Sequence, residues 1–301
     1  MKNPYLTETD FRQTRDFGGK ISATFEFIAA HFQPLGKCLI YIVLPWALLS
    51  GIGIGLVQTS FLDLFDSHSA VRASAGITSA TIAGLSGLIT GVAYILVSGV
   101  VYCYIRLRLV QPPSVVIEPG MVWRELQGRL LPMLGYGLLL GLIIGVGFLV
   151  LAIPGLYLSV AASLFYSIYF LEDTSFGDTM SRMLSLIRHY WWQTFALLVV
   201  MGLIRGVLGF VFQIPQMLIL MAKTLHWGFL GSDVVVISAQ CLATLGVVFL
   251  YVPGVVVDLF QYFHLSEEKD GLGMRHLINQ LGQAAPVVAD EHLRPDDEGE
   301  Y

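Results

Sequence analysis

Three ionisable side chains lie within or beside long apolar stretches of this 301-residue chain: Arg205, Asp233 and Asp258. An ionisable group at membrane depth is costly to keep there and is therefore a candidate functional residue. Arg205 lies 13 residues into the stretch Trp192–Phe212, whereas Asp258 lies 24 residues beyond Val234. Because these depths differ, we expect Arg205 to reach Asp233, at the outer start of the next stretch, rather than Asp258. The three residues form a candidate intramembrane polar site.

Two interpretations of Arg205 stay open. The favoured one is a structurally paired arginine whose long stem carries its charge towards the interface. The other is a group that recognises an anionic headgroup or substrate in a membrane cavity. Three further polar residues in apolar stretches, Thr90, Ser98 and Gln240, are expected to hydrogen-bond between helices.

Residue sets typical of enzymes and metal sites are missing from the sequence. None of the seven histidines lies in an apolar stretch, and no HExxH, Walker or GxSxG motif occurs. Cys38, Cys103 and Cys241 are far apart and form no CxxC or Cys/His cluster. We therefore expect a protein that is not an enzyme and has no catalytic residue, cofactor or metal.

The composition indicates whether the chain is surrounded by water or by lipid. Hydrophobic residues make up 55% of it and charged residues only 13%, with a mean hydropathy of +0.70. A soluble domain carries roughly a quarter charged residues, so most of this chain must face lipid. The fold class expected is all-α, a multi-pass helical membrane protein.

Six stretches reach the roughly 20 residues that a membrane helix needs. They are Cys38–Val57, Ile82–Tyr104, Leu131–Leu151, Pro154–Leu171, Trp192–Phe212 and Val234–Val252. The apolar run of the sixth continues to Phe263. We expect a break at Pro253, with the following segment running towards or along the inner interface.

The positive charges indicate the orientation. Fourteen Lys and Arg residues fall on the side of the termini and only Arg72 and Lys223 on the other, which predicts that both termini are cytoplasmic in the inner membrane of a bacterium. The N-terminal residues lack the features of a cleavable signal peptide. The net charge of −5 comes from an acidic tail of net −6 after residue 265, so no nucleic-acid-binding face is predicted.

Amphipathic segments precede the odd-numbered spans. Before the first, apolar residues recur at helical spacing from Phe17 to Phe32, and before the fifth from Phe176 to Trp191, where Ser175 provides a capping start. The two segments align at an offset of 159 residues, and a weaker counterpart around Trp123 precedes the third span. The pattern predicts interfacial helices on the cytoplasmic side and indicates a threefold repeat of interfacial helix, span, span.

Glycines at four-residue spacing are expected to bring helices close together. The pairs are Gly51/Gly55, Gly87/Gly91 and Gly202/Gly206, and the third span carries the triple Gly137, Gly141 and Gly145. Only the triple stands clearly above chance, and we expect it to pack within the monomer.

Residues 152–204 carry a Pro-Gly-Tyr turn, a span that ends at an acid, an amphipathic helix and tryptophans that open the next span. This run, with flanks that extend to about residues 11–283, resembles the membrane domain of glycerophosphoryl diester phosphodiesterases and related stand-alone bacterial membrane proteins. The catalytic barrel of that family is absent here, so the resemblance implies a membrane domain of undefined role and transfers no catalytic residue.

These patterns predict three regions: residues 1–37 with an interfacial helix, 38–263 as the six-span domain and 264–301 as a partly disordered acidic tail. The function expected is a non-enzymatic scaffold or lipid-organising component, with membrane lipids and other membrane or cytoplasmic proteins as partners. The alternative is a transporter or lipid-handling protein with Arg205 in a membrane cavity.

Overall fold

The computed structural model describes residues 8–66, 69–112 and 115–271, and these contain helices and no strands. The helices are α1 Glu8–Phe11, α2 Phe17–Ala30, α3 Phe32–Asp66, α4 Ser69–Val110, α5 Pro119–Val150, α6 Ala152–Ala162, α7 Phe165–Glu172, α8 Phe176–Ile187, α9 Trp191–Thr224, η1 Gly228–Gly231, α10 Asp233–Phe249 and α11 Val252–Asp270. Six segments are long and apolar enough to cross a membrane, which confirms the multi-pass all-α class.

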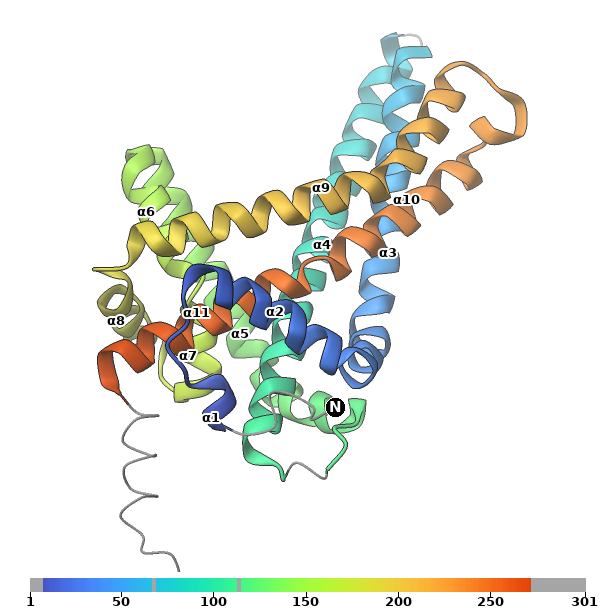
Figure 1. The fold of residues 1–301 in the computed structure, drawn as a ribbon. Helices are drawn as coiled ribbons and strands as arrows, with labels where there is room; N and C mark the ends of the chain where they lie inside the picture. The colour runs from blue at the N-terminus through green and yellow to red at the C-terminus, as the bar shows by residue number, and fades with distance from the viewer. Residues whose placement is uncertain (1–7, 67–68, 113–114, 272–301) are drawn as a thin grey trace, which may run out of the picture.

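The spans are longer than the apolar pattern predicted. The first begins at Phe32 rather than Cys38, because Pro34 is tolerated in the first turn of α3, where its missing N–H has no intrahelical partner. The fifth runs to Thr224 rather than Phe212 and contains Pro215. Three helical hairpins result: in Figure 1 the α3–α4 and α9–α10 hairpins extend to the upper right and the α5–α6 hairpin to the upper left. The opposite end, where α3, α5 and α9 begin and α11 ends, is called the basic end below.

Glycines bring the first and last hairpins together, but they are not the glycines that stood out in the sequence. A Cβ added to Gly51 or Gly55 would lie 2.6 and 3.0 Å from the backbone of Cys241 and Ile237 in α10. Gly141 in the triple has nothing within 4 Å of such an atom. The α3–α10 interface is therefore a close helix contact, and two of the three glycines of the triple have no neighbour within 4 Å of an added Cβ.

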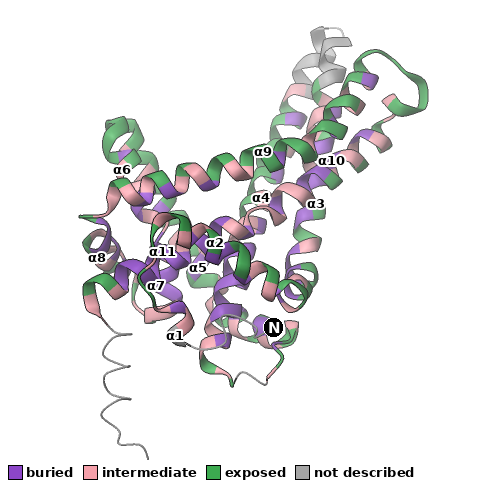
Figure 2. Cartoon of the chain, in the orientation of Figure 1, coloured by how far each residue is buried: buried purple, intermediate pink, exposed green. Residues whose placement is uncertain are grey.

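The sixth span breaks between α10 and α11, as predicted, with Pro253 in the first turn of the new helix. The helix runs towards the basic end, which is one of the two courses expected for it, and it is buried among other helices. Of its 19 residues, 13 are buried, and the helix contacts α2, α4, α7, α8 and α9. Figure 2 shows it as a largely buried segment among these helices. The helix is therefore stabilised by burial in protein, and its buried residues include the polar Gln261, His264 and Ser266.

Separate amphipathic helices precede the first and fifth spans, as predicted. Asp16 caps α2 by accepting from the Gly19 N–H, and Ser175 caps α8 by accepting from the Asp178 N–H. The third copy differs, because the segment around Trp123 forms the first turns of α5 and continues directly into the span. The repeat is therefore complete in two of its three copies.

Ion pairs join the helices at the basic end. Asp173 accepts from Arg106 at 2.7 Å and from Arg129 at 2.6 Å, and Glu125 pairs with both arginines. These contacts connect α4, α5 and the end of α7. The Arg106 guanidinium, followed by that of Arg129, holds the pKa of the Asp173 carboxyl below its usual value despite partial burial.

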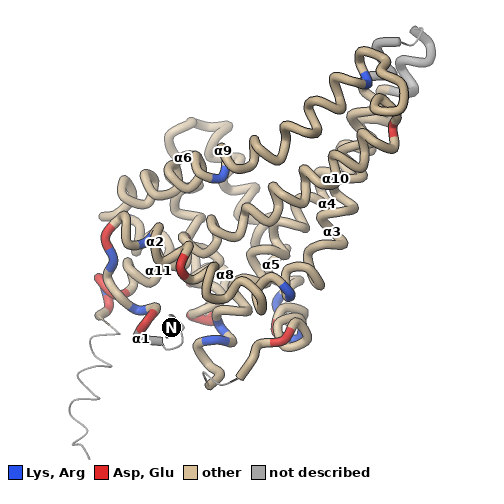
Figure 3. The backbone as a smooth tube through the Cα atoms, turned by 45° about the vertical axis from the view of Figure 1, so that its right-hand side comes forward, with Lys and Arg blue, Asp and Glu red and all other residues tan. Residues whose placement is uncertain are grey.

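A second group of ion pairs connects α8 to α7 and α11. Arg182 pairs with Glu172 at 3.1 Å and with Asp270, and the Tyr262 hydroxyl donates to Glu172. Figure 3 shows the charged residues gathered mainly near the helix ends, with long stretches of α3, α4 and α10 free of them.

Three glutamine side chains connect α3, α9 and α10 by hydrogen bonds. The Gln216 side chain donates to Gln58 at 2.6 Å, Gln58 donates to Gln240 at 3.0 Å, and Gln240 donates to Thr244. This confirms the interhelical role expected for Gln240. Amide side chains in an apolar bundle stabilise it most when they hydrogen-bond to one another in this way.

Candidate functional site

The structure places Arg205 against the break in the sixth span. Its guanidinium carbon lies 5.0 Å from the centre of the Tyr251 ring, and a Cβ added to Gly254 would lie 2.6 Å from its Nη1 atom. Asp258 lies one turn beyond Gly254 on the same face of α11, and its carboxylate interacts electrostatically with Arg205. The expectation that depth separates these two charges is wrong, because α9 crosses α11 at this point.

Asp233 has a different partner from the one predicted. Its carboxylate lies 2.5 Å from the Lys223 ammonium, across the turn between α9 and α10. Arg205 is 18 residues before Lys223 in the continuous helix α9, which corresponds to about 27 Å at 1.5 Å per residue. The pairing was mistaken because the apolar pattern ended the fifth span twelve residues too early, at Phe212 instead of Thr224. Arg205, Asp233 and Asp258 therefore do not form one site.

The other two polar residues singled out in the sequence contact neighbouring segments. Thr90 is hydrogen-bonded to Ser50 of α3, as expected of an interhelical contact. The Ser98 hydroxyl donates to the Tyr94 carbonyl of its own helix at 3.1 Å. Its side chain also interacts with that of Tyr251, in the break of the sixth span.

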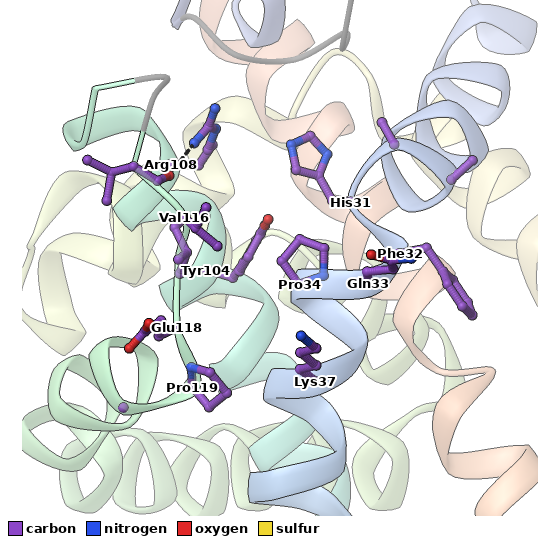
Figure 4. A pocket seen from close by; sticks show the side chains of 15 residues that line it. His31, Phe32, Gln33, Pro34, Lys37, Tyr104, Arg108, Val116, Glu118 and Pro119 are labelled. Atoms are coloured by element: carbon purple, nitrogen blue, oxygen red, sulfur yellow. Dashed lines mark hydrogen bonds between the residues drawn. The ribbon is translucent and has the colours of Figure 1, made fainter.

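A pocket of about 870 Å³ opens at the basic end, and the sequence did not reveal it. Its walls come from the end of α2, the start of α3, the end of α4 and the segment that leads into α5. The side chains that line it include His31, Phe32, Lys37, Tyr104, Arg108 and Glu118, which are labelled in Figure 4. A volume of this size suits a ligand of small-molecule dimensions.

Three polar side chains of this pocket are almost completely buried. Tyr104 is 2% exposed, His31 5% and Arg108 6%. The Arg108 Nη1 donates to the Val115 carbonyl at 3.1 Å, which holds the segment before α5 against the end of α4. The Tyr104 hydroxyl points into the hollow (Figure 4) and has no hydrogen-bond partner among the residues that the structure describes. The residue is buried but its hydroxyl oxygen is not fully enclosed, so a ligand atom in the hollow can reach it and form a hydrogen bond.

His31 is held in one orientation. One ring nitrogen, Nδ1, lies 3.1 Å from the Phe27 carbonyl, and the ring packs edge-on against Tyr104. A hydrogen bond to a carbonyl requires Nδ1 to carry the proton, which leaves Nε2 as the second functional atom. Burial lowers the pKa of His31, and the nearby Arg108 lowers it further against the effect of the Phe27 carbonyl. The ring is therefore neutral at physiological pH.

Two charged side chains face the pocket without partners. Lys37 in α3 and Glu118 before α5 are exposed, and neither forms an ion pair with any described residue. Glu118 occupies the N-cap position of α5, yet its side chain makes no capping hydrogen bond. Both charges are thus available to a ligand.

Within the described ranges, no group of three or more His, Cys, Asp and Glu side chains is placed to hold a metal ion. No family model, curated protein or solved structure matches this chain. The resemblance to the membrane domain of glycerophosphoryl diester phosphodiesterases therefore stays a prediction.

In the sequence, the cations of this pocket indicated only the orientation of the chain. Lys37 and Arg108 counted only as charges that set the orientation, one just before the first span and one just after the second. The available signal was that two cations and a glutamate stand close to the ends of three neighbouring spans. These three residues can be recognised as one site only when the helix packing is known.

Proposed function

We propose that this protein is a non-enzymatic, lipid-organising membrane component that binds a phospholipid headgroup in the pocket at its basic end. The observation that carries the proposal is the unpartnered Tyr104 hydroxyl, which lies in a hollow that Lys37 and Arg108 also line. A phosphodiester accepts hydrogen bonds from a hydroxyl and ion pairs from both cations.

The position of the pocket along the spans supports a lipid rather than a soluble ligand. It opens where α3 begins and α4 ends, which is the depth at which lipid headgroups lie beside a spanning helix. Phe32, at the start of α3, is 69% exposed at the pocket. An exposed aromatic ring at a helix end is typical of the membrane interface.

The leaflet follows from the charge distribution. In the sequence, fourteen Lys and Arg residues belong to the segments on the side of the termini and two to those on the other side, which supports a cytoplasmic position of the termini and the pocket in a bacterial inner membrane. The exposed face of α2, which includes Phe25 at 40%, would lie on the same leaflet.

Native mass spectrometry after purification in a mild detergent tests the proposal. We expect the wild-type protein to retain phospholipid and both Lys37→Met and Tyr104→Phe to lose most of it. Lys269→Met is the matched control, because Lys269 is an exposed lysine at the same end that lies outside this pocket. Equal retention by Lys37→Met and the wild type would contradict the proposal.

A second candidate is a transporter or lipid-handling protein that uses Arg205. The break of the sixth span under this arginine favours it, since interrupted helices commonly form the binding sites of transporters. Under this alternative, Arg205→Ala removes a co-purifying lipid or a transported solute. Under the main proposal, Arg205→Ala leaves lipid retention unchanged.

A further inference from the structure

The pocket at the basic end carries charges of both signs on separate elements. Lys37 belongs to α3 and Arg108 to α4, while Glu118 stands in the segment that enters α5. Figure 4 shows Glu118 and Lys37 on facing elements with the hollow between them. Glu118 does not neutralise either cation through an ion pair among the described residues.

An unpaired carboxylate is unusual at this end of the molecule. Glu125, Glu172, Asp173 and Asp270 all form ion pairs with arginines there. Glu118 neither joins these networks nor caps its helix. Its side chain therefore makes no ion pair and no capping bond among the described residues, and the residue lines the pocket.

The negative charge of Glu118 restricts the charge of a ligand that can bind in the pocket. A headgroup with only negative charge would gain from Lys37 and Arg108 but would be repelled by Glu118 at close range. A headgroup that joins a phosphate to a primary amine would satisfy both sides of the pocket, with the phosphate towards Lys37 and the Tyr104 hydroxyl. A primary ammonium also donates hydrogen bonds to a carboxylate, which a quaternary ammonium cannot do.

We infer that the pocket at the basic end selects a zwitterionic phospholipid of the phosphoethanolamine class, with its phosphate held by Lys37, Arg108 and Tyr104 and its ammonium by Glu118. This inference rests on the proposed function and adds the headgroup class. The same headgroup chemistry occurs in water-soluble phosphodiesters. The geometry points to the lipid, because Phe32 and Val116, exposed at 69% and 73%, border the pocket and suit acyl chains.

The test uses the full-length protein in detergent, supplied with equimolar phosphatidylethanolamine and phosphatidylglycerol and examined by native mass spectrometry. The wild type is expected to retain phosphatidylethanolamine about tenfold in preference, since a charge-assisted hydrogen bond is worth that much. Glu118→Gln should abolish the preference, and Lys37→Met should reduce retention of both lipids. Glu118→Asp, which keeps the charge, should retain part of the preference and shows that the variants fold.

Each other outcome has a defined meaning. Equal retention of the two lipids by the wild type, or a preference that survives in Glu118→Gln, overturns the headgroup assignment and leaves the proposed function standing. Retention of neither lipid by the wild type overturns both. Phosphatidylcholine retained as well as phosphatidylethanolamine overturns the requirement for a primary amine. Thermal stabilisation by soluble glycerophosphoethanolamine equal to that by the lipid overturns the lipid as the source.

Discussion

The guanidinium of Arg205 stacks on the ring of Tyr251, with 5.0 Å between its central carbon and the ring centre. Tyr251 stands in the break between α10 and α11, so the contact holds the middle of α9 against the point where the sixth span changes direction. A cation that is shielded from water gains more from an aromatic face than an exposed one does. The favoured sequence-based interpretation, a structural arginine, agrees with this contact, although its partner is an aromatic ring.

A double-mutant cycle measures this contact. We expect Arg205→Met and Tyr251→Leu to show a coupling energy of about 0.5–2 kcal/mol, because each single variant removes the same cation–aromatic interaction. The measurement is the free energy of unfolding in detergent for both variants and their combination. Additive effects within about 0.3 kcal/mol would show that the two side chains do not stabilise each other.

Gly51 should be the glycine least tolerant of substitution. A Cβ there would lie 2.6 Å from the backbone Cα of Cys241, so Gly51→Val must push α3 and α10 apart and should cost about 2–4 kcal/mol. Gly202→Val is the matched control, since nothing lies within 4 Å of a Cβ at that position. Thermal unfolding that showed equal losses for both variants would refute the α3–α10 contact.

Such glycine contacts show how far sequence reasoning extends. The number of spans, the break near Pro253 and the cap at Ser175 follow from local patterns, and all of them were predictable. Which glycines touch another helix depends on how the hairpins pack, and spacing within one span does not encode that. In the most regular pattern, the triple in α5, only Gly137 lies against another helix, where a Cβ would meet the Tyr166 hydroxyl at 2.5 Å.

Lys20 should make the stability of the protein depend on pH. Its side chain is 0% exposed and its Nζ has no hydrogen-bond partner among the described residues. Burial lowers the pKa of Lys20 to about 8, although the charges of Glu268 and Asp16 act in the opposite direction. The unfolded chain therefore binds more protons between about pH 8 and 10.5, and stability rises with pH in that interval.

Replacing this lysine removes the dependence. We expect Lys20→Met to stabilise the protein at pH 7 by up to about 3 kcal/mol, because a shift of one pKa unit corresponds to about 1.4 kcal/mol. The gain should disappear as the pH approaches 10.5. Lys37→Met removes an exposed lysine and is the control for the loss of a positive charge. A Lys20→Met variant less stable than the wild type at pH 7 would mean that the ammonium is satisfied in the protein.

The proposed orientation predicts opposite accessibility of two exposed positions. Ser181 lies in α8 at the basic end, and Thr224 lies at the far end of α9. In spheroplasts, a membrane-impermeant thiol reagent should label Thr224→Cys before lysis and Ser181→Cys only after lysis. The reverse pattern would invert the orientation.

The pocket itself could not be predicted for a physical reason. His31, Lys37, Arg108 and Glu118 come from four separate segments, and each has an ordinary local explanation as a helix end or an orientation charge. Their convergence depends on the packing of α2, α3 and α4 and on the Arg108 contact with Val115. One sequence read by itself contains none of these distances.

The most direct test of the central claim is to locate the bound lipid. A phosphatidylethanolamine with a photoreactive group beside its glycerol can be cross-linked to the purified protein and the modified peptides identified by mass spectrometry. We predict cross-links concentrated in residues 29–37 and 104–120, and their loss in Tyr104→Phe combined with Lys37→Met. Cross-links spread over the exposed faces of α5 and α9, unchanged in that double variant, would contradict the account.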